Sequence, residues 1–177
     1  SIDQTRRVGR VRFENVAVAA DALLAGASEA TLARVLDLAT AAVTAELLGA
    51  AGAALQITVK YAQEREQFGS PIGRFQGVKH PLAEMLVDVE SAKSILYYAA
   101  WCLDERDPDA ARATSLAKAY ASEAFARIGV DSVQLHGGVG FTWEYDPHLY
   151  LKRSKWARPA FGDSDFHYDR AIAIGEQ

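Results

Sequence analysis

The residue types best suited to chemistry lie in a glycine-rich turn in the C-terminal part of the chain. Gln134 is followed by a His-Gly-Gly-Val-Gly run, so that Gly137, Gly138 and Gly140 fall within four positions. Clustered glycines end a helix, and the absence of a Cβ lets backbone N–H groups approach a bulky anion closely. Such a turn can bind a phosphate or a flavin-type cofactor, with the Gln134 amide as a further ligand. Taken alone, however, it is more typical of a plain helix C-cap followed by a loop.

A second candidate segment lies upstream, in the sequence Arg65-Glu-Gln-Phe-Gly-Ser-Pro-Ile-Gly-Arg-Phe-Gln76. The guanidinium fork of Arg65 matches the geometry of a diphosphate. The alternative is that Arg65 only pairs with Glu64 or Glu66 at a helix end. For Phe68 the alternatives are contact with a ligand and packing in the core.

Composition limits the classes of protein. The 177 residues are 50% hydrophobic and 24% charged, with a net charge of −4, which is typical of one globular domain and argues against a nucleic-acid partner. A single cysteine, Cys102, excludes an internal disulfide, and the four histidines show no metal-ligand spacing. We see no apolar run long enough to span a membrane and no signal peptide, so we expect a cytoplasmic protein with no metal site.

The elements that position these residues follow from the hydrophobic periodicity. Residues 8–18 alternate apolar and polar types, which predicts one or two strands. From Ser28, a plausible N-cap, apolar residues recur every three or four positions over about 38 residues, which predicts a long helix. We therefore assign residues 1–26 to the trailing edge of a β domain and residues 27–177 to a helical domain.

Further helices follow, each with its own start signal. Asp-Pro pairs place a helix N-cap before a proline that suits the first turn. The short connections between long helices predict an all-α, up-and-down antiparallel four-helix bundle, with a short extra C-terminal helix and a remnant β segment at the N-terminus. The predicted helices are Leu82–Leu103 with Pro81 in its first turns, one from Asp107-Pro108 to about Leu135, one from Asp146-Pro147 to about Trp156, and a last one capped by Asp163 and ending near Ile174.

Three sequence blocks resemble the C-terminal domain of acyl-CoA dehydrogenases in their order and spacing. They are the segment from Arg65 to Gln76, the run Leu82-Ala-Glu-Met85, and the segment from Gln134 to Glu144. The resemblance implies an FAD-dependent oxidoreductase that acts on an acyl-CoA thioester. It also implies a homo- or hetero-oligomer, such as a dimer of dimers, and an electron-transfer acceptor protein. In that family this domain forms the oligomer core and holds part of the FAD of a neighbouring subunit.

The resemblance extends to individual cofactor-binding positions. Arg65 resembles the arginine that reaches the FAD pyrophosphate, and Phe68 resembles the aromatic residue beside the adenine end. Gln134, Gly137 and Gly138 resemble the glutamine and the glycine backbone that contact the same part of FAD.

The two positions that carry the family's glutamate base hold other residues. Alignment from Gly140 and Glu144 places Phe161 at one of them, and counting back from Arg65 places Ala39 at the other. A phenyl ring and a methyl group cannot accept a proton. We therefore expect a subunit of a heteromeric enzyme whose partner carries the base.

Three alternatives remain. The chain could be catalytic and use Asp163, which lies in the same loop as Phe161. It could belong to a related flavoprotein oxidase or hydroxylase. It could also be a non-catalytic helical interaction module. The acyl chain length and any steroid character of the substrate are not readable from these residues.

Overall fold

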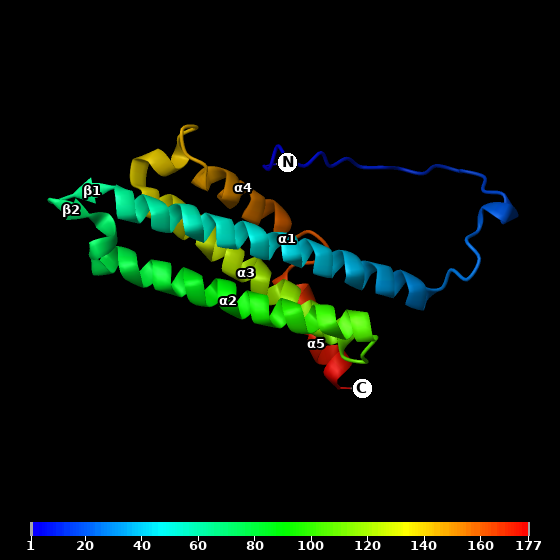
Figure 1. Cartoon of the computed structure of the whole chain (residues 1–177). Helices are drawn as coiled ribbons and strands as arrows, with labels where there is room; N and C mark the ends of the chain where they lie inside the picture. The colour runs from blue at the N-terminus through cyan, green and yellow to red at the C-terminus, as the bar shows by residue number, and fades with distance from the viewer. Residues whose placement is uncertain (1, 177) are drawn as a thin grey trace.

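The computed structural model describes residues 2–176 and is an all-α structure with one very short hairpin (Figure 1). The fold class predicted from the sequence is confirmed. Its helices are α1 (Glu29–Glu64), α2 (Gln76–Glu105), α3 (Ala110–His136), α4 (Pro147–Ala157) and α5 (Ser164–Gly175), its strands are β1 (Glu66–Gln67) and β2 (Ser70–Pro71), and its 3-10 turns are η1 (Ala20–Ala22), η2 (Ile72–Arg74) and η3 (Gly137–Phe141).

Helix α3 lies at the centre of the bundle and packs against α1, α2, α4 and α5. Because successive helices run up and down, α1 and α3 point in the same direction and end at the same end of the bundle (Figure 1). The hairpin and η3 lie at that end, and α5 lies towards the other. Buried residues of α1, α2 and α3 form the main core, which includes Leu47, Leu55, Met85, Phe125 and Ile128.

Most helix ends lie where the sequence predicts them. The Ser28 side chain accepts a hydrogen bond from the Thr31 backbone N–H and so caps α1. Helix α3, however, begins at Ala110 and not at Asp107-Pro108. The Asp107 carboxylate accepts a hydrogen bond from the Asp109 N–H at 2.8 Å, which holds a turn ahead of the helix instead of capping it.

The N-terminal strand prediction is wrong. Residues 8–18 contain no strand, and their alternating apolar side chains are exposed. A strand needs a hydrogen-bonded neighbour, and in the part of the chain that the structure describes no other segment pairs with this one. The assignment of residues 1–26 to a β domain remains a prediction.

The expectation that no apolar run could span a membrane is also wrong. By length and composition alone, α1 is long and apolar enough to do so. Its many alanines raise its apolar content although they are small. The core helix of a soluble protein can have the same length and composition, and α1 packs against α2, α3 and α4 in the bundle.

Two predictions for the second helix have different outcomes. Cys102 lies beside Trp101 in an apolar helical stretch, which predicts a buried structural thiol, and it is fully buried. The helical spacing of Tyr97, Tyr98 and Trp101 predicts a place in the core or at a subunit interface. All three are exposed, so they do not belong to the core of this chain. An interface role for these three residues stays a prediction.

Truncation of the α1 core should destabilise the bundle. Leu47 is 2% exposed and Leu38 on the same helix is 47% exposed. We expect Leu47→Ala to lower the free energy of unfolding by about 2–5 kcal/mol, because it removes buried surface and leaves a cavity. Leu38→Ala is the matched control and should cost under about 1 kcal/mol. Urea unfolding followed by circular dichroism measures both, and equal effects would contradict the assigned core.

Candidate functional site

A groove of about 440 Å³ lies at the end of the bundle where α1 and α3 terminate. It brings Arg65, the first residue after α1, together with His136 and Val139 at the end of α3 and in the turn that follows. Arg65 and the residues His136 and Val139, which lie 71 and 74 positions later in the sequence, thus share one concave surface. The remaining lining residues are Ile57, Lys60, Tyr61, Glu64 and Tyr145.

The wall of this groove is fixed by aromatic contacts. The Tyr61 and His136 rings stack with their centroids 4.4 Å apart, and Tyr145 meets Tyr61 edge to face at 5.7 Å. His136 Nδ1–H donates to the Ser132 carbonyl at 2.7 Å, which orients the ring, and burial lowers the pKa of His136. The imidazole is therefore held in one orientation beside the groove.

The three glycines in the turn after α3 differ in whether the fold requires a glycine at that position. Gly137 is the C-cap of α3 with φ 62°, a conformation that a side chain disfavours. A Cβ on Gly140 would lie 2.5 Å from the Val133 carbonyl oxygen, so Gly140 permits close packing of the turn on α3. Gly138 has neither constraint, since its φ is ordinary and no atom lies within 4 Å of a built Cβ. Packing within this chain does not explain Gly138, and its backbone is open to the approach of a ligand.

Phe68 lies at the tip of the hairpin between β1 and β2. Phe68 and Gly69 form its two-residue turn and both have positive φ, of 54° and 75°. The Phe68 side chain is 93% exposed and meets only Phe75 edge to face, at 6.1 Å. The alternative of core packing is thus excluded for this chain, and the hairpin holds an aromatic ring out from the bundle.

The donors at this end of the bundle fit a dinucleotide phosphate. Gln134, Gly137 and Gly138 are exposed, and Arg65 is exposed and makes no ion pair with any residue in the described range 2–176. The alternative pairing of Arg65 with Glu64 or Glu66 is therefore not formed. A free guanidinium next to a turn of bare peptide groups is a chemically suitable anion site.

A second cavity, of about 480 Å³, lies between α1 and α5. Phe161 lines it, as do Leu36, Asp37 and Thr40 of α1, whereas Ala39 is half-buried and is not part of the lining. Asp37 is buried and pairs with Arg170 of α5 at 2.7 Å. The other residues that line this cavity are Ala33, Gly162, Phe166, His167 and Arg170.

A buried lysine, Lys118, holds the loop that carries Phe161. The Lys118 ammonium donates to the Arg158 and Gly162 carbonyls and to the Ser122 hydroxyl, at 2.9–3.1 Å. Burial lowers the pKa of Lys118 to about 8, against the opposing effect of nearby carboxylates. Phe161 itself has φ 60°, which is strained for a bulky residue and persists only where the surroundings enforce it.

Asp163, the candidate base, is engaged elsewhere. Its carboxylate accepts the Phe166 backbone N–H at 3.0 Å and caps α5. Asp163 is exposed and does not line the cavity that Phe161 faces. The geometry gives it a structural role as an N-cap.

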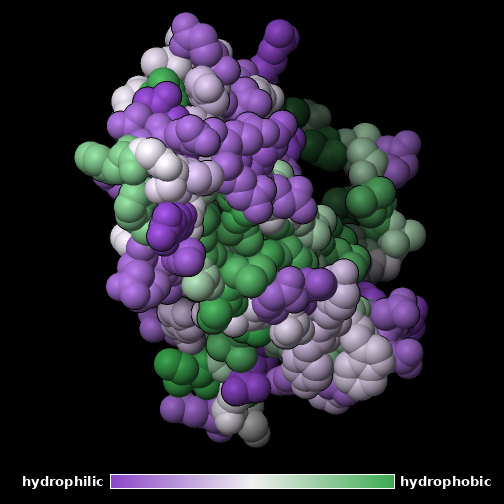
Figure 2. Space-filling view, turned by 60° about the vertical axis from the view of Figure 1, so that its left-hand side comes forward, coloured by the Kyte–Doolittle hydropathy of each residue, from purple (hydrophilic) through white to green (hydrophobic). Residues whose placement is uncertain are grey.

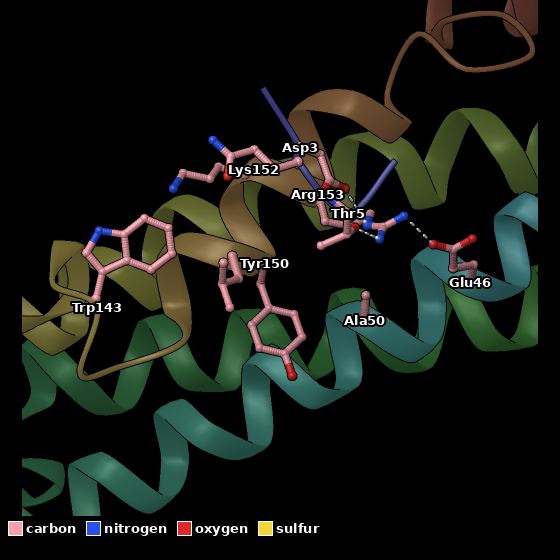
Figure 3. A pocket seen from close by; sticks show the side chains of 10 residues that line it. Asp3, Thr5, Glu46, Ala50, Trp143, Tyr150, Lys152 and Arg153 are labelled. Atoms are coloured by element: carbon pink, nitrogen blue, oxygen red, sulfur yellow. Dashed lines mark hydrogen bonds and ion pairs between the residues drawn. The ribbon is translucent and has the colours of Figure 1, made fainter. Parts of the chain in front are cut away.

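A third pocket, of about 440 Å³, lies where residues 3–5 meet α1 and α4 (Figure 3). Arg153 bridges the carboxylates of Asp3 and Glu46 at 2.8 and 2.7 Å, and Trp143, Tyr150 and Ala50 form the other walls. These ion pairs fasten the start of the chain to the bundle. Within residues 2–176 no group of three His, Cys, Asp or Glu side chains is placed to hold a metal ion.

Comparison with known proteins identifies the family of this chain. Residues 25–173 match the family described as "Acyl-CoA dehydrogenase, C-terminal domain". The chain belongs to the acyl-CoA dehydrogenase family. Acyl-CoA dehydrogenase IpdE2 of Mycobacterium tuberculosis is 38% identical over 87% of this chain and 43% of its own length.

Two solved structures resemble the bundle. A variant of the Tcur3481-Tcur3483 steroid ACAD superposes with a TM-score of 0.80 and 33% identity, over 84% of this chain and 41% of that one. The ChsE4-ChsE5 complex from Mycobacterium tuberculosis gives 0.76 and 35%, over 80% and 38%. This chain therefore spans about two fifths of the length of these relatives.

Sequence reasoning missed the polar residues around the second cavity. These residues belong to no sequence motif, because each is a single polar residue within a helix that is recognised by its apolar positions. They are Lys118, His167 and the pair Asp37–Arg170. The one available signal is a lysine within the apolar stripe of the third helix.

Glycine substitutions should separate packing from ligand approach in the turn after α3. We expect Gly140→Ala to destabilise the protein by about 1–3 kcal/mol, because its Cβ overlaps the Val133 carbonyl oxygen. Gly138→Ala should change stability by less than about 0.5 kcal/mol. Thermal unfolding of the two variants checks this, and a Gly138→Ala loss as large as that of Gly140→Ala would show that both glycines serve packing.

Proposed function

We propose that this chain is the C-terminal domain of an FAD-dependent acyl-CoA dehydrogenase subunit that lacks the usual glutamate base and works in a heteromeric complex. The groove shared by Arg65 and the turn after α3 carries this proposal. In it, Arg65 binds the FAD pyrophosphate, Gly137 and Gly138 present backbone N–H groups, and Gln134 adds an amide. Phe68 lies against the adenine end. When bound, FAD supplies the hydride acceptor for α,β-dehydrogenation of the thioester.

The position of these residues supports binding of FAD from a neighbouring subunit. Arg65, Phe68 and Gln134 all point outward from the bundle, since each is exposed. A cofactor bound there would lie on the surface of this domain. Its other half then has to be held by another domain, which agrees with the short span of this chain relative to its relatives.

Exposed apolar surface supports assembly with further subunits. Figure 2 shows an apolar area rimmed by polar residues on one face of the bundle. A groove of about 620 Å³ lies between α1 and α2, with Leu38, Tyr97 and Leu103 among its walls. Apolar surface of this kind is typical of subunit interfaces. The hetero-complex ChsE4-ChsE5 among the similar structures favours unlike subunits.

The proposed lack of the usual base rests on Phe161. It lines the cavity between α1 and α5, and no glutamate lines that cavity. The partner subunit would then supply a glutamate in its own site. An electron-transfer protein as acceptor and a cytoplasmic location complete the proposal.

Removal of the Arg65 side chain should weaken FAD binding. In the full-length subunit, purified with its partner, we expect Arg65→Ala to lower FAD affinity by about 10-fold or more, because one charge-assisted contact is lost. Flavin absorbance after gel filtration measures retention. Lys93→Ala, which removes a cation from α2 away from the groove, is the control. Equal flavin occupancy in the wild type and Arg65→Ala would remove Arg65 from the site.

Asp163→Asn tests the alternative base. Asparagine caps a helix nearly as well as aspartate, so we expect unfolding to change by less than about 1 kcal/mol. Turnover of an acyl-CoA with an artificial electron acceptor should stay within a few-fold of the wild type. A loss of about 10³-fold with FAD still bound would make Asp163 the base and this chain the carboxylate-bearing subunit.

A further inference from the structure

The cavity between α1 and α5 combines apolar walls with one ion pair. Leu36, Phe161 and Phe166 supply large apolar surfaces. Asp37 of α1 and Arg170 of α5 are the two charged residues in its lining, and Nη1 of Arg170 lies 2.7 Å from the Asp37 carboxylate. A cavity of about 480 Å³ with such walls suits the apolar body of a small ligand, whose polar substituents are then selected by the few polar side chains present.

The Arg170 guanidinium is held through one of its nitrogens. Nη1 contacts Asp37 and also donates a hydrogen bond to the Ser115 hydroxyl of α3 at 3.0 Å, so two neighbouring helices fix its position. Within residues 2–176, Nε and Nη2 make no hydrogen bond, and neither is a buried atom. The side chain is 27% exposed and belongs to the cavity lining. Arg170 therefore offers N–H donors to a molecule in the cavity.

The other polar side chains of the lining have no donor to spare. The Thr40 hydroxyl donates to the Leu36 carbonyl at 2.7 Å. The His167 ring nitrogen Nε2 lies 3.0 Å from the Phe161 carbonyl, which only accepts hydrogen bonds, so its proton is used there. Among the side chains that line the cavity, Arg170 is thus the one with free donors in the part of the chain that the structure describes.

The charges around the cavity favour an uncharged ligand group. Asp37 offsets the charge of Arg170, and the Lys118 ammonium is bound to backbone carbonyls of the neighbouring loop. Burial lowers the pKa of His167, so its ring is neutral at pH 7. A ligand carboxylate beside Arg170 would also lie close to the Asp37 carboxylate and be repelled. A carbonyl or hydroxyl oxygen can accept the hydrogen bond without this repulsion.

We propose that this cavity binds an acyl group whose apolar body carries a carbonyl or hydroxyl oxygen, and that Arg170 selects it by donating a hydrogen bond to that oxygen. This inference rests on the proposed function, which supplies the thioester. The event is binding alone, in which no covalent bond forms or breaks. Asp37 and Ser115 are positioning residues, because they hold the guanidinium. Phe161 forms an apolar wall beside the body of the acyl group.

Matched ligands test this specificity. The probes are 3-cyclohexylpropanoyl-CoA and its 3-oxocyclohexyl and 4-oxocyclohexyl analogues, which differ from the parent by one ketone oxygen. Isothermal titration calorimetry on the full-length, flavin-containing complex gives the affinity and the number of sites. We expect this chain's site to bind at least one ketone about 10-fold more tightly than the parent, because a hydrogen bond from a charged donor is gained. The 4-carboxycyclohexyl analogue should gain nothing.

Replacement of both members of the ion pair gives the sharpest variant. Asp37→Leu/Arg170→Leu leaves no unpaired buried charge, and apolar replacements of an ion pair are often tolerated. We expect the preference for the ketone to fall to about 2-fold or less, with the parent bound as tightly as before. Asp88→Leu/Arg127→Leu, the matched control, removes an ion pair between α2 and α3 outside the cavity and should keep the preference. Thermal unfolding verifies that each variant folds.

The outcomes separate this inference from the proposed function. The comparison of ligands in the wild type needs no variant, so a variant that does not fold leaves the test in place. A complex that binds flavin and the parent thioester but prefers neither ketone, prefers the carboxylate, or keeps its preference in the folded Asp37→Leu/Arg170→Leu variant overturns the role of Arg170. A complex that binds neither flavin nor thioester overturns the proposed function, and this inference with it.

Discussion

The register of α1 against α3 is the constraint on which the proposed FAD-binding groove depends. The hydroxyls of Thr58 and Ser132, both fully buried, are 2.7 Å apart, and one turn further Tyr61 stacks on His136. Because the two helices point the same way, these contacts place both of their C-terminal ends at one level. Arg65 and Val139, which lies in the turn from Gly137 to Gly140, therefore line one groove, although they are far apart in the sequence.

The other end of the bundle has a different set of side chains. Phe161 lines the cavity between α1 and α5, and the Asp37 carboxylate in its wall is paired with Arg170. The loop that carries Phe161 is held by Lys118 and His167, and Phe161 itself has a positive φ. One long helix, α1, thus links the proposed cofactor-binding end to a cavity lined by a different set of polar residues.

Sequence reasoning succeeded where a local rule acts alone. Ser28 and Asp163 cap their helices because a side-chain oxygen satisfies nearby N–H groups whatever the surroundings. It failed at residues 8–18, since a strand depends on a partner that the alternation of side chains cannot reveal. The glycine-rich turn beside the groove could be recognised because its glycines are clustered in sequence. The contact of His167 with the Phe161 carbonyl could not, since the cavity around it is made by tertiary packing.

A structure of the full-length complex with FAD tests the central claim most directly. The account predicts that the guanidinium of Arg65 and the backbone N–H groups of Gly137 or Gly138 lie within hydrogen-bonding distance, about 3 Å, of the pyrophosphate of an FAD held mainly by another subunit. An FAD whose pyrophosphate is bound without any residue of the groove between α1 and α3 would contradict it.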